Sequence, residues 1–232
     1  KLVKPNITPL NGRDTICVKW GTNTVIPGSE VTLDSGIPVG SPVAAYSYQW
    51  YYNTGTALVA IPGATSQTYT IQGTPTYLSG DYSVVVTSLS TLACPSEPSN
   101  VFTVKKSGPA SIGVPEYFVS NAFADNQTVT VNYLGGFGVY EYSLDGGPWQ
   151  SSPVFESVPF GSHSIEIKDV ASPIYSCSTP PIEGIYTIDF PHFFTPNGDG
   201  QNDTWNISGL SNQSDAKIYI FDRYGKLVKQ IS

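Results

Sequence analysis

Turn-forming residues interrupt this chain at short intervals, and their spacing limits its fold more than any other feature. The 232 residues include 22 glycines and 19 prolines, and the runs between them are rich in Thr, Val, Tyr and Ile. Such runs favour pleated strands, whereas frequent glycine and proline break helices. No stretch shows sustained helical periodicity. The pattern predicts an all-β chain, and at roughly 100 residues per domain it predicts two sandwiches and a shorter third unit.

Charge and hydropathy exclude several kinds of partner. The formal net charge is -7, so we expect the chain to repel nucleic acids and anionic lipid surfaces. Only 12% of the residues are charged, and solubility that depends on Ser, Thr, Asn and Gln is typical of extracellular β-proteins. No apolar run approaches the roughly 20 residues that span a bilayer, so we do not expect an integral membrane protein. The first residues read like the last strand of a preceding domain, and we expect a fragment whose targeting signal lies upstream.

The first predicted unit, residues 1–105, has the features of an immunoglobulin-like sandwich. Trp50 shares strand parity with nearby tyrosines and can lie between two sheets. Tyr82 resembles the immunoglobulin tyrosine corner, with Val84 at the position of the usual second cysteine. The partner segment 31–33 is also apolar, so we expect hydrophobic packing in place of the inter-sheet disulfide. The predicted strands are Thr15–Lys19, Ser29–Asp34, Tyr46–Tyr52, Gln67–Ile71, Asp81–Thr87 and Asn100–Val104.

The second predicted unit, residues 106–188, contains two distinctive strand motifs. Residues 142–147 read Tyr-Ser-Leu-Asp-Gly-Gly, a strand that runs into a tight turn. Residues 158–169 read Val-Pro-Phe-Gly-Ser-His-Ser-Ile-Glu-Ile-Lys-Asp. Together they resemble the adhesin-type repeats of gliding-motility surface proteins, which implies a further β-sandwich. The predicted strands are Tyr117–Asn121, Thr128–Leu134, Val139–Leu144, Val154–Val158 and Ser164–Lys168.

The third predicted unit, residues 189–232, carries the most informative motif. After Phe193 the chain reads Phe-Thr-Pro-Asn-Gly-Asp-Gly-Gln-Asn-Asp-Thr-Trp, and a hairpin pattern follows over residues 216–228. This closely resembles the opening of the gliding-motility-associated, type B C-terminal sorting domain of type IX secretion cargo in Bacteroidetes. We expect the N-terminal part of that domain only, so the predicted fold is tandem immunoglobulin-like β-sandwiches followed by a partial β-sandwich sorting domain. The resemblance rests on Phe194, Thr195, Pro196, Asn197, Gly198, Asp199, Gly200, Asn202, Asp203 and Trp205.

The resemblance implies a route and partners. The protein is expected to cross the inner membrane and the periplasm, to be recognised by the type IX outer-membrane translocon, and to reach the cell surface or the medium. A porin-like outer-membrane protein of the PorP/SprF type is the second implied partner. The end of the chain is locally basic, and we predict that Lys217, Arg223 and Lys226 contact this partner. A solvated hairpin edge is the alternative for these three residues.

The three cysteines fit an exported protein, in which disulfides are permitted. Cys17 and Cys94 resemble a stapled pair in immunoglobulin-like repeats of Bacteroidetes surface proteins, which implies a Cys17–Cys94 disulfide and an unpaired Cys177. A zinc site is a poor alternative, because zinc takes four Cys or His ligands and the chain has three cysteines and two histidines.

No arrangement of residues predicts an enzyme or a cofactor. His163 and His192 are the only candidate bases for acyl transfer, and His163 shares strand parity with two isoleucines, as a packing residue does. Asp199 and Asp203 offer oxygen ligands suited to Ca²⁺, but their loop lacks the spacing of an EF-hand. We favour the alternative that the loop residues set turn conformations and bond to nearby backbone. Thr15, in Asp-Thr-Ile, fits a short motif that Bacteroidetes O-glycosylate.

These features predict a non-catalytic, C-terminal piece of a surface or secreted protein. The full protein is expected to be an adhesin that serves gliding motility or attachment to surface glycans or solid surfaces. The alternative is a secreted polysaccharide-degrading enzyme whose catalytic domain lies upstream and whose spacers are these modules. Carbohydrate binding by exposed aromatic residues such as Trp20 or Trp149 is a third hypothesis.

Overall fold

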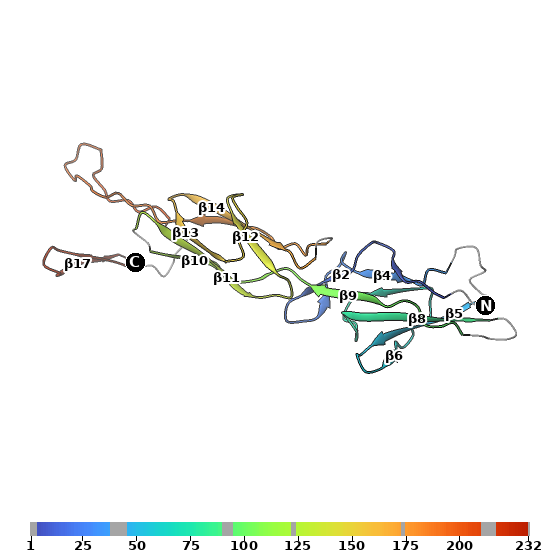
Figure 1. Cartoon of the computed structure of the whole chain (residues 1–232). Coiled ribbons are helices and arrows are strands. Elements are labelled where there is room, and N and C mark those ends of the chain that lie inside the picture. Colours follow the sequence, from blue (N-terminus) through green and yellow to red (C-terminus); the bar gives the residue numbers. More distant parts are fainter. Residues whose placement is uncertain are drawn as a thin grey trace. The chain divides into compact units, whose positions relative to one another are not determined.

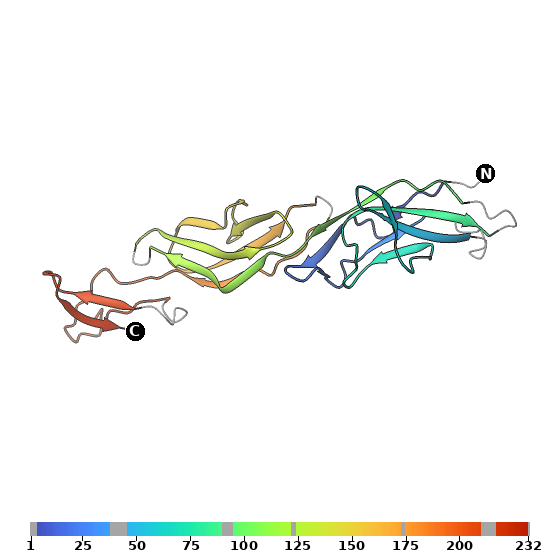
Figure 2. The same cartoon turned by 90° about the horizontal axis from the view of Figure 1, so that it is seen from below.

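The chain consists of strands and turns in the residues that the structure describes (Figures 1 and 2). The structure is a computed structural model that describes residues 4–37, 46–89, 95–121, 124–172, 175–209 and 217–231. In these ranges no helix is long and apolar enough to cross a membrane. Contacts divide the chain into two compact units. Unit 1 comprises Lys1–Ser111, Leu134–Glu141 and Ile167–Thr179, and unit 2 comprises Ile112–Tyr133, Tyr142–Glu166 and Pro180–Ser232.

Unit 1 is built on two sheets. The three-stranded sheet has the order β1–β4–β7, and the six-stranded sheet has the order β3–β2–β9–β8–β5–β6. β2 pairs in parallel with β9, and the other pairs are antiparallel. The strands are β1 (Thr8–Pro9), β2 (Thr15–Lys19), β3 (Thr24–Val25), β4 (Val31–Asp34), β5 (Tyr46–Asn53), β6 (Leu58–Ala60), β7 (Thr68–Ile71), β8 (Gly80–Ser88) and β9 (Phe102–Ser107).

The core between these sheets confirms the expected packing. Trp50 is fully buried and lies opposite Val84 in the pairing of β5 with β8. Val31 and Leu33 are also fully buried, so apolar side chains occupy the place of an inter-sheet disulfide. The hydroxyl of Tyr82 donates to the carbonyl oxygen five residues earlier at 2.9 Å, which is the geometry of a tyrosine corner.

The disulfide differs from the predicted one. Cys17 is bonded to Cys177, with 5.6 Å between the Cα atoms, so the Cys17–Cys94 pairing and the unpaired Cys177 were wrong. Cys94 itself lies outside the described residues. The physical reason is that the segment Ile167–Thr179 belongs to unit 1, where Tyr175 donates its hydroxyl to the carbonyl oxygen of Asn11 at 3.0 Å. This fold brings together two cysteines that are 160 residues apart in sequence.

Three further sheets involve the strands after residue 110. Their orders are β10–β11–β13, β12–β14–β15 and β16–β17. Most of their residues, including the buried Val129, Ile165 and Ile185, belong to unit 2. The strands are β10 (Ser111–Ser120), β11 (Gln127–Gly135), β12 (Tyr140–Leu144), β13 (Val154–Val158), β14 (Ser162–Asp169), β15 (Ile182–Tyr186), β16 (Ile218–Phe221) and β17 (Leu227–Ile231).

β10 begins earlier than the sequence predicts. The predicted strand was Tyr117–Asn121, but β10 starts at Ser111 and passes through Pro115. Proline removes a backbone donor and is therefore tolerated mainly in edge strands. β10 is the edge of its sheet, which explains why the strand can continue across this residue.

Candidate functional site

The turn over residues 195–203 is held by its own side chains. The carboxylate of Asp203 accepts the backbone N–H groups of Gly198 and Gly200, each at 2.7 Å between nitrogen and oxygen. The two glycines have positive φ angles of 79° and 84°, a region in which a side chain with a Cβ is strained. The local sequence therefore determines this backbone, because glycine permits the conformation and Asp203 fastens it.

Asp199 adds a second set of bonds in the same turn. Its carboxylate accepts the N–H of Gln201 at 2.7 Å and the side-chain amide of Asn197 at 2.8 Å. These bonds favour the charged carboxylate and hold the pKa of Asp199 below its usual value. The two glycine N–H groups lower the pKa of Asp203 in the same way. The bonds support the interpretation that these carboxylates set the turn. In the described ranges no cluster of three acidic, His or Cys side chains could hold a metal ion.

A buried glutamine holds the chain at Ile188, ahead of the turn. Gln127 is fully buried on β11, and its side-chain amide donates to the carbonyl oxygen of Ile188 at 2.5 Å. The Ile188 N–H donates back to the Gln127 side-chain oxygen at 2.9 Å. Sequence analysis missed this pair, because a glutamine on a strand carries no signal of its partner. The alternation of Gln127 with buried Val129 was the only hint that it faces the core.

Two more contacts join the beginning and the end of residues 189–208. Asp189 and Ser208 exchange backbone hydrogen bonds of 3.2 and 2.7 Å. The indole N–H of Trp205 donates to the carbonyl oxygen of Pro191 at 2.7 Å. Trp205 is half-buried, so it anchors residues 189–208 at their own base.

An apolar groove of about 650 Å³ lies beside Trp205 and is here called the aromatic groove. It is formed by the chain entering the turn and by the hairpin of β16 and β17. Phe193 and Phe194 remain 69% and 50% exposed. Exposed aromatic surface that gathers in one groove is typical of an interaction site. Its lining includes Phe190, Phe193, Phe194, Trp205, Tyr219 and Ile231.

The hairpin carries the predicted basic residues. The side chain of Asp222 accepts the N–H groups of Tyr224 and Lys226, both at 2.9 Å, and so shapes the turn between β16 and β17. Lys217, Arg223 and Lys226 are exposed. Within the described ranges no carboxylate forms an ion pair with these three side chains. The Arg223 guanidinium lies over the ring of Tyr224, 4.8 Å from its centroid. Three exposed basic side chains without an acidic partner in those ranges suit either a contact surface or a solvated edge.

Two other predicted sites have structural surroundings that limit their roles. Thr15 is only 1% exposed, and its hydroxyl donates to Asp14 at 2.8 Å. The three-residue motif says nothing about burial, and O-glycosylation at this buried residue stays a prediction. Trp20 packs against Phe137 with ring centroids 4.9 Å apart, and 42% of it remains exposed, as does 40% of Trp149.

The histidines are engaged in contacts. His163 is buried, and its ring nitrogens lie 2.7 Å from the Asp145 carboxylate and 3.0 Å from the carbonyl oxygen of Pro159. Burial alone would raise the pKa of Asp145, but the bonds from His163 and a backbone N–H hold it below its usual value. His192 is exposed and lies 3.7 Å from Asp125. His163 thus serves packing and hydrogen bonding, as its strand parity indicates.

Residues 188–231 match the family described as the CHU_C Type IX secretion signal domain. This match supports a type IX sorting domain at these residues and export of the chain to the cell surface or extracellular space. Comparison with curated proteins found no match.

Several solved structures are similar to the chain. Fibronectin(III)-like modules of CbhA from Clostridium thermocellum are 14% identical in sequence to this chain, with a TM-score of 0.33. The match covers 78% of this chain and 93% of the chain of the modules. The human OSCAR ligand-binding domain is 13% identical, covers 79% of this chain and 98% of its own, and has a TM-score of 0.32. A Ca²⁺-stabilized adhesin that helps an Antarctic bacterium bind ice is 12% identical, covers 79% of this chain and 49% of its own, and has a TM-score of 0.37.

Proposed function

We propose that this chain is the non-catalytic, C-terminal part of a protein that the type IX system exports, and that the segment from residue 188 is its sorting signal. The observation that carries the proposal is the match of residues 188–231 to the secretion signal family. The proposed receptor is the outer-membrane translocon together with a PorP/SprF-like protein. The surface that it reads must be common to many cargoes, and therefore lies in this segment and not in the sandwiches.

The self-fastened turn, which is the turn over residues 195–203 held by its own side chains, offers the translocon a preformed surface. Asp199 and Asp203 hold the turn through hydrogen bonds within a few residues, so recognition does not have to order a flexible loop. The aromatic groove supplies apolar surface, and the exposed Lys217, Arg223 and Lys226 supply positive charge. We assign the charged hairpin to the contact with the membrane partner.

The role of the full protein is a second part of this proposal. We favour a surface adhesin that serves attachment or gliding motility, because residues 142–147 and 158–169 resemble the adhesin-type repeats of gliding-motility surface proteins. The alternative is a secreted polysaccharide-degrading enzyme for which these modules are spacers. The sequence of the gene upstream of Lys1 separates the two: many further repeats favour the adhesin, and a catalytic domain favours the enzyme.

The sorting proposal is tested by export of the full-length, epitope-tagged protein from its native cell. We expect the protein to reach the surface or medium only when the type IX translocon is intact. Gly200→Val should reduce export, because a β-branched residue is strained at a φ of 84°. No atom lies within 4 Å of the position that a Cβ would take, so the effect comes from the backbone. Gly200→Asn is the matched control, since asparagine tolerates this region.

A charge reversal tests the hairpin separately. Arg223→Glu with Lys226→Glu should lower export while the fold survives by circular dichroism. The matched control reverses two exposed lysines of unit 1, Lys4→Glu with Lys19→Glu, and should export normally. Normal export of the hairpin variant would remove the basic residues from the mechanism. Normal export of the wild-type protein from cells without the translocon would contradict the sorting assignment itself.

A further inference from the structure

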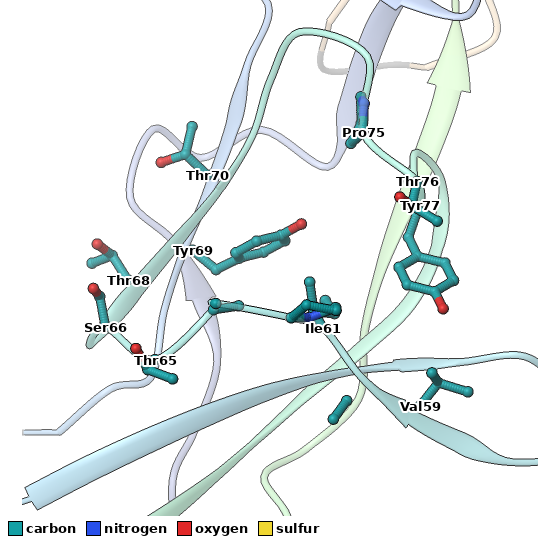
Figure 3. A pocket seen from close by; sticks show the side chains of 14 residues that line it. Val59, Ile61, Thr65, Ser66, Thr68, Tyr69, Thr70, Pro75, Thr76 and Tyr77 are labelled. Atoms are coloured by element: carbon teal, nitrogen blue, oxygen red, sulfur yellow. The ribbon is translucent and has the colours of Figure 1, made fainter.

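A pocket of about 520 Å³ lies at the side of unit 1, between the edges of its two sheets. β6 is the last strand of the six-stranded sheet, β7 is the last strand of the three-stranded sheet, and residues 61–67 connect them. In Figure 3 the ring of Tyr69 lies near the middle of the lining. Thr65, Ser66 and Thr68 lie to one side of it, and Pro75 and Tyr77 lie to the other. The pocket thus collects side chains from two edge strands and the loops beside them.

The wall of this pocket is held in place without a ligand. Trp50 donates its backbone N–H to the carbonyl oxygen of Ala64 at 3.0 Å and accepts the N–H of Ile61 at 2.9 Å. Its indole N–H donates to the carbonyl oxygen of Ser66 at 2.9 Å. Trp50 is fully buried, so the connecting loop is fastened to the core of the sandwich. A wall that is already ordered adds little entropic cost to binding.

Two tyrosine rings in the lining are also fixed. Tyr69 packs against the buried rings of Trp50 and Tyr82, with centroids 6.0 Å apart in both pairs. Tyr77 stacks on Tyr52 at 4.3 Å between centroids. Burial raises the pKa of Tyr69, so its hydroxyl stays protonated and can donate a hydrogen bond. Among the described residues nothing bonds to this hydroxyl.

The remaining lining is polar but uncharged. Thr65, Ser66, Thr68 and Thr76 line the pocket, and their hydroxyl groups have no protein partner in the described ranges. None of the 14 lining residues is an Asp, Glu, Lys, Arg or His. A charged ligand would be desolvated here without a countercharge, and a purely apolar one would leave the hydroxyls unsatisfied. Rigid aromatic side chains beside several hydroxyl groups suit a molecule that has both apolar faces and many neutral hydroxyls.

We propose that this pocket binds a short stretch of a neutral polysaccharide. The sugar faces pack on Tyr69 and Tyr77, and the sugar hydroxyls bond to the threonine and serine side chains and to the Tyr69 hydroxyl. The pocket volume lies within the range of small-molecule sites, about 300 to 1,000 Å³. This goes beyond the sorting proposal, which concerns unit 2, and it places a glycan contact at a site other than Trp20 and Trp149.

The test uses the purified 232-residue chain, so its result does not depend on export. The probes are immobilised neutral glucan, mannan, xylan and galactan oligosaccharides, with alginate and polygalacturonate oligosaccharides as acidic counterparts. Titration calorimetry then gives the Kd for the best neutral probe. We expect neutral probes alone to bind, Tyr77→Ala to weaken binding roughly tenfold, and Tyr69→Phe to weaken it roughly fivefold by removing one hydrogen bond.

Controls keep the result specific to the pocket. Tyr69→Phe retains the ring that packs on the core, so it remains informative if Tyr77→Ala unfolds. Tyr224→Phe changes a tyrosine that is 79% exposed on the hairpin of unit 2 and should leave Kd unchanged. The proposal is overturned if no neutral probe binds, if acidic probes bind equally well, or if Tyr69→Phe binds like the wild type. The proposal is likewise overturned if both pocket variants bind the sugar like the wild type and Trp20→Ala loses binding.

Discussion

The disulfide between Cys17 and Cys177 allows the sharpest test of the fold. The perturbation is the double substitution Cys17→Ser with Cys177→Ser, and the matched control is Cys94→Ser. Cys17 and Cys177 are 7% and 2% exposed, and serine differs from cysteine by little volume. The principal effect of the double substitution is therefore loss of the covalent link. The control removes a third thiol and leaves that link in place.

The expected loss follows from the length of the closed loop. The cysteines are 160 residues apart, and the chain-entropy relation then gives about 5 kcal/mol of stabilisation at 25 °C. The whole free energy of unfolding of a domain is about 5 to 15 kcal/mol. We therefore expect the double variant to unfold at a much lower urea concentration than the wild type, or to be unfolded at 37 °C.

The assay is urea unfolding followed by tryptophan fluorescence, for which the buried Trp50 is a suitable reporter. Non-reducing peptide mapping of the wild type should recover a peptide that joins Cys17 and Cys177. We expect reduction of the wild type to shift its midpoint to that of the double variant, and Cys94→Ser to behave as the wild type. Strong destabilisation by Cys94→Ser with none from Cys177→Ser would refute the reasoning and restore the pairing that the sequence predicts.

Three further predictions concern single groups. Gln127→Leu should lower the free energy of unfolding by about 2 to 4 kcal/mol, because it leaves the buried N–H and carbonyl of Ile188 without partners; urea unfolding checks this, and an unchanged midpoint would contradict it. Tyr82→Phe should cost about 1 kcal/mol through loss of the tyrosine-corner bond, with a lower melting temperature as the measure. The pKa of Asp203 is lowered by its backbone bonds, so its stabilisation of the turn is present above about pH 4 and is lost as pH falls through the lower folded pKa. The amide NMR signal of Gly200 should move over that acidic range, and a midpoint above pH 4 would show that the bonds do not form.

Much of the local structure could be predicted from the sequence, because its causes lie within a few residues. Turn residues on either side of short runs rich in Thr, Val, Tyr and Ile identified most strands of unit 1 to within a few residues, including β2 and β5. The short strands β1, β3 and β6 were missed, since two or three residues carry too little pattern. The turn around Gly200 was also predictable, because positive φ calls for glycine and nearby Asp side chains bond to the backbone.

The sequence by itself determined the strands, the tyrosine corner and the self-fastened turn, since each depends on side chains that meet their partners along a short stretch of chain. Only the tertiary structure decided that Cys17 meets Cys177, that Gln127 bonds to Ile188, and that Thr15 is buried. It also formed the pocket around Tyr69, which needs the edges of two different sheets. Contacts of this kind join segments separated by many residues, so they follow from which strands pair and which faces pack, and no local pattern encodes that choice.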